Sequence, residues 1–61
     1  MKPTIIIAQL AANGWICFQR EGEFISFRHP SRDGIITFHE TDEMTNLIVK
    51  LISLKSGVKL P

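Results

Sequence analysis

Residues 14–30 constrain the fold of this chain more than any other stretch. Two apolar-rich segments, 15–20 and 23–29, flank a short polar turn that contains Gly22. This pattern is typical of a β-hairpin, because glycine tolerates the positive φ that tight turns require. We therefore predict two antiparallel strands, the second of which ends at His29-Pro30.

Alternation along the second strand assigns its two faces. Ile25 and Phe27 point toward a core, whereas Phe24, Ser26 and Arg28 point away from it. A slip of one residue would exchange the faces, but Ile25 and Phe27 form the stronger apolar pair. Phe24 is therefore predicted to lie on the outer face of the sheet.

The other two strands are assigned in the same way. In the first strand the predicted core pair is Ile16 and Phe18, and the opposite face carries Cys17 and Gln19. A loop rich in turn-forming residues is expected over 30–34, followed by a third strand over 35–39. Its inward residues are Ile36 and Phe38, and its outward residues are Ile35, Thr37 and His39.

Residues 4–12 are predicted to form the first helix. The three consecutive isoleucines favour a strand, because β-branched side chains lose rotamer freedom in a helix, whereas Ala-Gln-Leu-Ala-Ala favours a helix. Thr4 can act as the N-cap, and Asn13-Gly14 can end the helix. Ile6, Ile7 and Leu10 would then share one face. A strand over 4–7 is the alternative.

A second helix is predicted to start at Thr41-Asp42-Glu43, where Thr41 or Asp42 can cap the acidic first turn. Its expected buried stripe consists of Met44, Leu47, Ile48, Leu51 and Ile52. Lys55 and Ser56-Gly57 are expected to close the helix. Val49 and Leu54 lie off the stripe and would add apolar surface for a dimer. Residues 58–61 are expected to form a frayed tail.

The element order is α-β-β-β-α in a single small domain over 1–61. It predicts an α+β fold in which a three-stranded antiparallel sheet carries both helices on one face. A chain of 61 residues is small enough that disulfides, a metal or a partner chain usually support its core. Cys17 is the only cysteine, which excludes an internal disulfide and suits a reducing, cytoplasmic compartment.

The composition gives little support to several classes of function. The net charge of +1 is far below that of a dedicated nucleic-acid binder. The longest apolar run, Ile5-Ile6-Ile7-Ala8, is too short to span a membrane. No spacing of cysteine and histidine matches a metal site, so we expect neither a metal nor a cofactor.

Several different short motifs follow one another along the chain in a recognisable order. Asn13-Gly14-Trp15 follows the first helix, Gly22 lies in the hairpin turn, Phe27-Arg28-His29-Pro30 closes the second strand, and Gly34 precedes the third. These residues resemble the HicA toxins, bacterial ribonucleases of toxin–antitoxin systems with a fold like the double-stranded-RNA-binding domain. The resemblance covers nearly the whole chain. It implies this fold, RNA as a substrate and an antitoxin-like protein as a partner.

The chain departs from the HicA pattern where catalysis is concerned. Phe24 stands where the family has its catalytic histidine, and Glu23 replaces the serine before it. Gln19, with Arg20 beside it, stands where the first strand often carries a basic residue. Phenylalanine cannot exchange a proton, and a carboxylate would repel a phosphate. The resemblance therefore implies a member of the fold without ribonuclease chemistry.

The candidate RNA-binding residues are Arg20, Arg28 and Arg32, which with Phe24 could hold a single strand by charge and stacking. Acidic residues interleave with these arginines, which favours an ordinary solvated surface instead. The two histidines are assigned structural roles. His29 is restricted to an extended backbone by the following proline, and His39 and Glu40 point to opposite faces.

Two functions stay open. In the first, a non-catalytic HicA-like module associates with a second copy or with an antitoxin-like protein through an exposed surface containing Phe24 and Ile35. In the second, the domain binds or cleaves RNA as the family does, with a steep dependence on salt.

Overall fold

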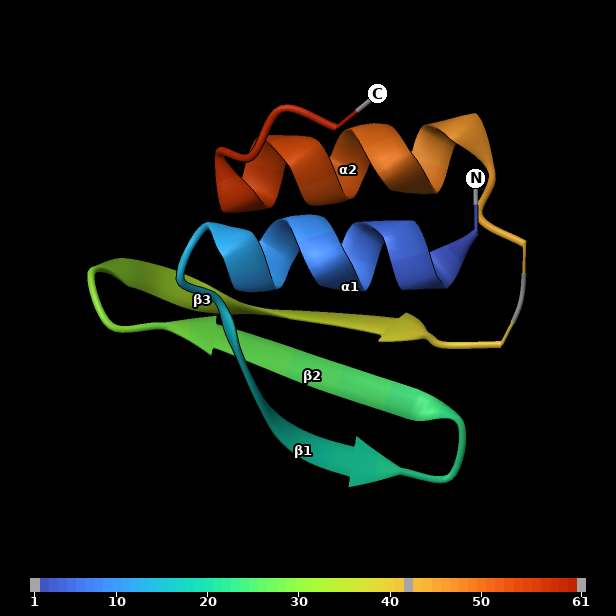
Figure 1. Ribbon diagram of the computed structural model, residues 1–61, viewed down its shortest axis with the longest axis horizontal. Coiled ribbons are helices and arrows are strands. Elements are labelled where there is room, and N and C mark those ends of the chain that lie inside the picture. The colour runs from blue at the N-terminus through green and yellow to red at the C-terminus, as the bar shows by residue number, and fades with distance from the viewer. Residues whose placement is uncertain (1, 42, 61) are drawn as a thin grey trace.

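The computed structural model describes residues 2–41 and 43–60, and Figure 1 shows the arrangement of its helices and strands. The elements are α1 (Pro3–Ala12), β1 (Ile16–Glu21), β2 (Phe24–His29), β3 (Arg32–His39) and α2 (Asn46–Ser56). The strands form one antiparallel sheet in the order β1-β2-β3, so β1 and β3 are its edges. The predicted α+β fold, with an open three-stranded sheet, is confirmed.

The core lies between the sheet and the two helices. Ile25 and Phe27 of β2 and Ile36 and Phe38 of β3 are buried, as the alternation of these strands predicts. The rings of Phe27 and Phe38 stack with centroids 5.7 Å apart. The same cluster contains Ile6 and Leu10 from α1, Val49 and Ile52 from α2, and Trp15, Met44 and Val58 from outside the helices and strands.

The prediction that Ile16 and Phe18 belong to the core is wrong, because every residue of β1 is exposed. The pairing of β1 with β2 shifts by one residue between Cys17 and Gln19, which makes Phe18 the extra residue of a β-bulge. Ile16 therefore lies opposite Arg28 on the face of the sheet away from the helices. Directly opposed residues share a face, so alternation through the bulge does not hold.

The connection between β2 and β3 is shorter than the predicted loop over 30–34. β3 begins at Arg32, and its pairing with β2 shifts between Phe27 and His29. Gly34 has a φ of 91°, a conformation that glycine adopts without strain and that is common in bulges. The turn-forming residues Asp33 and Gly34 thus lie in an irregular part of the strand.

The helix α1 is confirmed over its whole predicted length and begins one residue earlier, and the strand alternative over 4–7 is wrong. Its N-cap is Lys2, with no capping hydrogen bond from a side chain, so the prediction that Thr4 caps the helix is also wrong. Pro3 occupies the first turn, where its missing N–H costs no intrahelical bond and its fixed φ suits the helix. Ile6 and Leu10 face the core as predicted.

The helix α2 begins later than the acidic segment predicts. Its N-cap is Thr45, whose Oγ1 accepts a hydrogen bond from the N–H of Ile48 over 3.3 Å. Thr41 is not the cap, and the alternative cap Asp42 lies outside the described residues. At the other end, Gly57 is in the left-handed conformation and closes the helix as predicted.

The buried face of α2 also differs from the prediction. Val49, which was placed off the stripe, is buried together with Ile52 and Ser56. Leu47, Ile48 and Leu51 are exposed, and so is Leu54. Met44 is buried, but it precedes α2 and is not part of the helix. Its burial therefore does not determine which side of α2 faces inward. An apolar face of α2 is therefore left outside the core.

The segment after α2 is packed against the domain rather than frayed over 58–60. Val58 is buried, and Leu60 packs against the core. The hydroxyl of Ser53 donates to the carbonyl oxygen of Val58 over 2.7 Å, and the N–H of Val58 donates to the buried Ser56 Oγ over 3.1 Å. These bonds hold the chain across the end of α2. Pro61 lies outside the described residues.

Candidate interaction surface

Phe24 lies at the start of β2 and is 54% exposed, so the prediction that it faces outward is confirmed. Its register partner in β3 is His39, and the two rings meet edge to face with centroids 5.1 Å apart. His39 Nε2 lies 2.7 Å from Glu23 Oε2, and its Nδ1 is 3.1 Å from Thr41 Oγ1. Both nitrogens of this imidazole thus have polar partners at the position that faces Phe24.

The open sheet face, made of the β2 and β3 residues that point away from the helices and the β1 residues opposite them, is part apolar and part polar. Ser26 and Thr37 are register partners whose hydroxyl oxygens are 2.9 Å apart. The guanidinium of Arg28 lies over the ring of Phe18, 6.0 Å from its centroid, a geometry that favours cation–π attraction. Ile35 is exposed, as predicted.

The three candidate RNA-binding arginines have different surroundings. Arg20 is the register partner of Ile25, on the helix side of the sheet, and its guanidinium forms an ion pair with Glu40. The hydrogen bond and the charge of Glu40 raise the pKa of Arg20. Arg28 lies on the open sheet face over Phe18.

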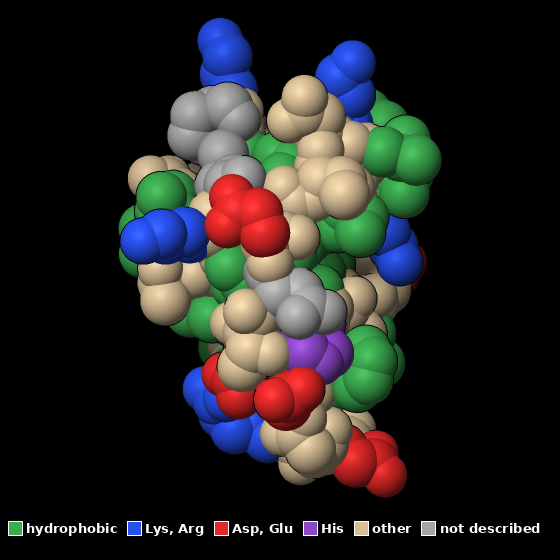
Figure 2. All heavy atoms as spheres, turned by 90° about the vertical axis from the view of Figure 1, so that its right-hand side faces the viewer, with side chains coloured by type: hydrophobic (Ala, Val, Ile, Leu, Met, Phe, Trp, Pro, Cys, Tyr) green, Lys and Arg blue, Asp and Glu red, His purple; other side chains and the backbone are tan. Residues whose placement is uncertain are grey.

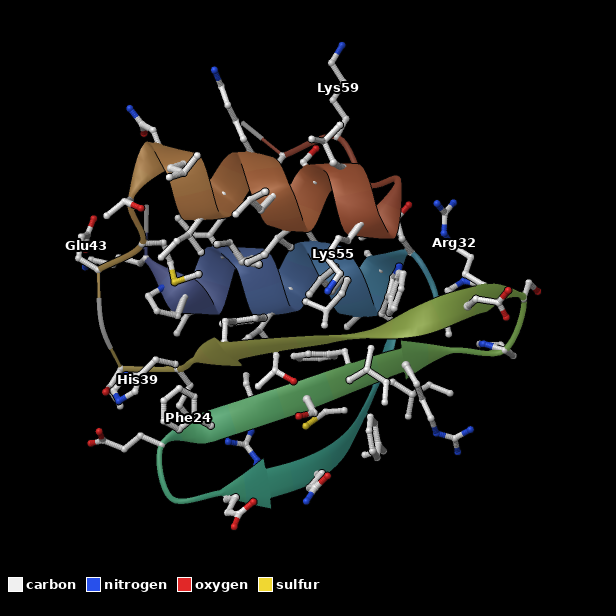
Figure 3. The ribbon with its side chains drawn as sticks, turned by 180° about the vertical axis from the view of Figure 1, so that it is seen from behind. Phe24, Arg32, His39, Glu43, Lys55 and Lys59 are labelled. Carbon is white, nitrogen blue, oxygen red and sulfur yellow. The ribbon has the colours of Figure 1, made fainter. Side chains whose placement is uncertain are left out.

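Arg32 is placed at the other end of the sheet. Its guanidinium is so close to Gly57 that a Cβ there would lie 2.5 Å from one of its nitrogens. Figure 3 shows this side chain beside the end of α2, away from Phe24 and His39. Arg20, Arg28 and Arg32 therefore point into three separate parts of the surface.

His29 joins the end of β2 to the loop after α1. The N–H of Ser31 donates to His29 Nδ1 over 3.0 Å, so Nε2 carries the proton and donates to the carbonyl oxygen of Asn13 over 3.1 Å. The imidazole also packs edge-on against Trp15, with centroids 5.3 Å apart. These contacts give His29 a structural role, as the following proline suggests.

A groove of about 470 Å³ separates β3 from α2. Thr37 and Phe38 lie on its strand side, and Ile48 and Leu51 on its helix side. Lys55 spans it near one end, where Nζ donates to the carbonyl oxygen of Ile35 over 3.2 Å. The sequence pattern does not predict this groove, because Ile48 and Leu51 on its helix side are expected in the core. Thr45, a good N-cap after the acidic segment, is a signal for the later start of α2, but an N-cap does not determine which side of the helix faces the core.

Figure 2 shows the larger groups of hydrophobic side chains on the right-hand side of the view and smaller groups on the left. The exposed members on α2 are Leu47, Ile48, Leu51 and Leu54, which we call the α2 stripe. Leu54 is 78% exposed and Leu51 is 51% exposed. Exposed apolar residues that cluster in this way commonly mark a surface for another protein.

The described residues provide no group of three His, Cys, Asp or Glu side chains that could hold a metal ion. Across residues 2–41 and 43–60, neither helix has the length and apolar character needed to cross a membrane. No protein-family model and no curated protein matches the chain. The HicA resemblance therefore rests on the residues of this chain alone.

Proposed function

We propose that this protein is a non-catalytic, HicA-like module that acts by associating with another protein chain. The observation that carries this proposal is Phe24, an exposed phenylalanine at the place of the family's catalytic histidine. The ring has no group that could accept or donate a proton in a cleavage step. Association with protein is the function that an exposed aromatic ring on an open sheet supports best.

The electrostatics around Phe24 favour the same proposal. The carboxylates of Glu23 and Glu40 flank the hairpin end of the sheet, and the guanidinium of Arg20 is already paired with Glu40. A phosphate backbone would meet negative charge there without a grouped set of cations to neutralise it.

The single cysteine, Cys17, is compatible with the reducing cytosol in which we expect the protein to act.

RNA binding or cleavage is the second candidate, and one observation favours it. His39 lies directly across from Phe24 in the sheet, so an imidazole is present one strand away from the expected catalytic position. Its pairing with Glu23 resembles the carboxylate–imidazole pairs that general bases use. In this candidate, Arg28 would contribute to phosphate binding from the open sheet face.

Incubation with labelled single-stranded and hairpin RNA at low salt separates the two candidates. The proposed function predicts that the RNA stays intact and that fluorescence anisotropy detects no saturable binding. Cleavage that disappears in a His39→Ala variant would overturn the proposal. So would binding that falls steeply with salt and is lost on Arg28→Ala.

A further inference from the structure

Within residues 2–41 and 43–60, no strand lies beside the outer edge of β3, which pairs with β2 along its other edge. The N–H of Glu40 bonds to the carbonyl oxygen of Glu23, whereas the carbonyl oxygen of Ile35 accepts from Lys55 on the opposite side. Because backbone groups alternate in direction along a strand, those of Thr37 also point away from β2. Such an edge is a template for pairing with another strand.

The α2 stripe borders this edge across the groove. Ile48 and Leu51 line the groove together with Thr37. Leu47 and Leu54 lie on the same side of α2, because residues four and three positions from Leu51 share a helix face. A partner that extended the sheet at β3 would therefore meet the α2 stripe as well.

Opposite charges stand at the two ends of the groove. Figure 3 shows Glu43 and His39 at one end and Lys55 at the other, with Lys55 reaching from α2 toward β3. α2 and β3 run in opposite directions in Figure 1. A surface with one acidic and one basic end is complementary to a copy of itself turned by half a rotation, since each acidic end then meets a basic end.

We propose that the β3 edge and the α2 stripe bind the same surface of a second copy of this chain. The two β3 strands pair antiparallel about an axis perpendicular to the sheet near Thr37, and the sheet continues across both copies. This axis places both α2 helices on one face, where their stripes pack and Glu43 of each copy meets Lys55 of the other. Parallel pairing of the strands would instead place the two helices on opposite faces. This dimer rests on the proposed function, protein association, and identifies the partner.

Sedimentation equilibrium over a wide range of protein concentration tests the dimer. The wild-type chain is expected to dimerise, and Leu51→Glu is expected to weaken the dimer by about tenfold or more by burying a charge in the apolar stripe. Lys50→Glu, which changes the charge of α2 outside the stripe, serves as the control and is expected to dimerise like the wild type. Circular dichroism verifies that each variant is folded.

Charge reversal tests the two-fold arrangement itself. Glu43→Lys or Lys55→Glu alone places like charges together and is expected to weaken the dimer severalfold, whereas the double reversal is expected to restore it. The exchange of the Thr37 amide hydrogen is expected to slow as the dimer forms. A monomer at every concentration would overturn the inference, and so would a dimer unaffected by Leu51→Glu or a double reversal as weak as the singles.

The failure of the dimer and the failure of the proposed function give different results. Self-association that survives Leu51→Glu but is lost on Phe18→Asp would overturn the dimer and retain the proposed function, with the contact on the open sheet face that carries Phe24. RNA cleavage by the wild-type chain would overturn the proposed function, whatever the oligomeric state.

Discussion

The Nε2 of His29 donates a hydrogen bond to the carbonyl oxygen of Asn13 over 3.1 Å. This bond joins the end of β2 to the loop that follows α1. The same imidazole packs against the ring of Trp15. Two of the motifs that carry the HicA resemblance, Asn13-Gly14-Trp15 and His29-Pro30, thus meet in space. Their contact ties these residues to the stability of the fold, independently of any catalytic role.

Replacement of Gly14 by alanine is expected to destabilise the protein for two reasons. Gly14 has a φ of 90°, and a Cβ there would lie 2.9 Å from His29 Nε2. The positive φ alone costs a non-glycine residue roughly 1–2 kcal/mol, and the clash adds to it by displacing the imidazole. Urea denaturation, followed by circular dichroism, measures the loss in the free energy of unfolding.

Gly34→Ala is the matched control for that variant. Gly34 has nearly the same φ, 91°, but a Cβ there would meet nothing within 4 Å. The difference between the two variants in the free energy of unfolding therefore reports the contribution of the contact with His29. Equal losses of stability in Gly14→Ala and Gly34→Ala would contradict the structural role assigned to this imidazole.

His29→Ala is expected to lower the free energy of unfolding by about 1–3 kcal/mol, because it removes both hydrogen bonds and the packing partner of Trp15. Trp15 is the only tryptophan, so its fluorescence reports on this site. The emission of the folded variant should shift to longer wavelength. His39 lies at the other end of the sheet, so His39→Ala should leave the emission unchanged. An equal shift in His39→Ala would contradict the contact assigned to His29 and Trp15.

Thr45→Ala is expected to destabilise the domain by about 1 kcal/mol, the usual cost of losing an N-cap. The hydroxyl of Thr45 accepts from the N–H of Ile48, whereas Thr4, the cap suggested by the sequence for α1, makes no capping bond. Thermal unfolding of Thr45→Ala and Thr4→Ala compares the two positions. A larger loss in Thr4→Ala would mean that the helix starts are misplaced.

The local patterns of the sequence predict most of this fold. Gly22 at the turn, the alternation through Ile25 and Phe27, and the glycine that ends α2 each act through local backbone conformation or a strict period. Such signals depend on residues that are close in the sequence, so the packing of the whole domain does not change the structure that they predict. The prediction that Phe24 lies on the outer face, which depends on the same alternation, is confirmed.

The groove could not be predicted, because it depends on choices that local patterns leave open. α2 is apolar over so much of its circumference that Val49 and Leu51 compete for the core, and packing decides in favour of Val49. In β1, the bulge at Phe18 reverses the alternation that assigns Ile16. The error in α2 removed exposed apolar residues from the expected surface and so concealed the groove, whereas the error in β1 concealed Ile16 and Phe18 on the surface of β1.

An isotope-filtered NOE experiment on a mixture of labelled and unlabelled chains tests the central claim most directly. The two-fold dimer predicts intermolecular contacts between the methyl groups of Leu51 in one copy and the α2 stripe of the other, together with contacts between the two copies of Thr37. Intermolecular contacts confined to Phe18 and Ile16 on the open sheet face, or none at concentrations where the chain should be dimeric, would contradict it.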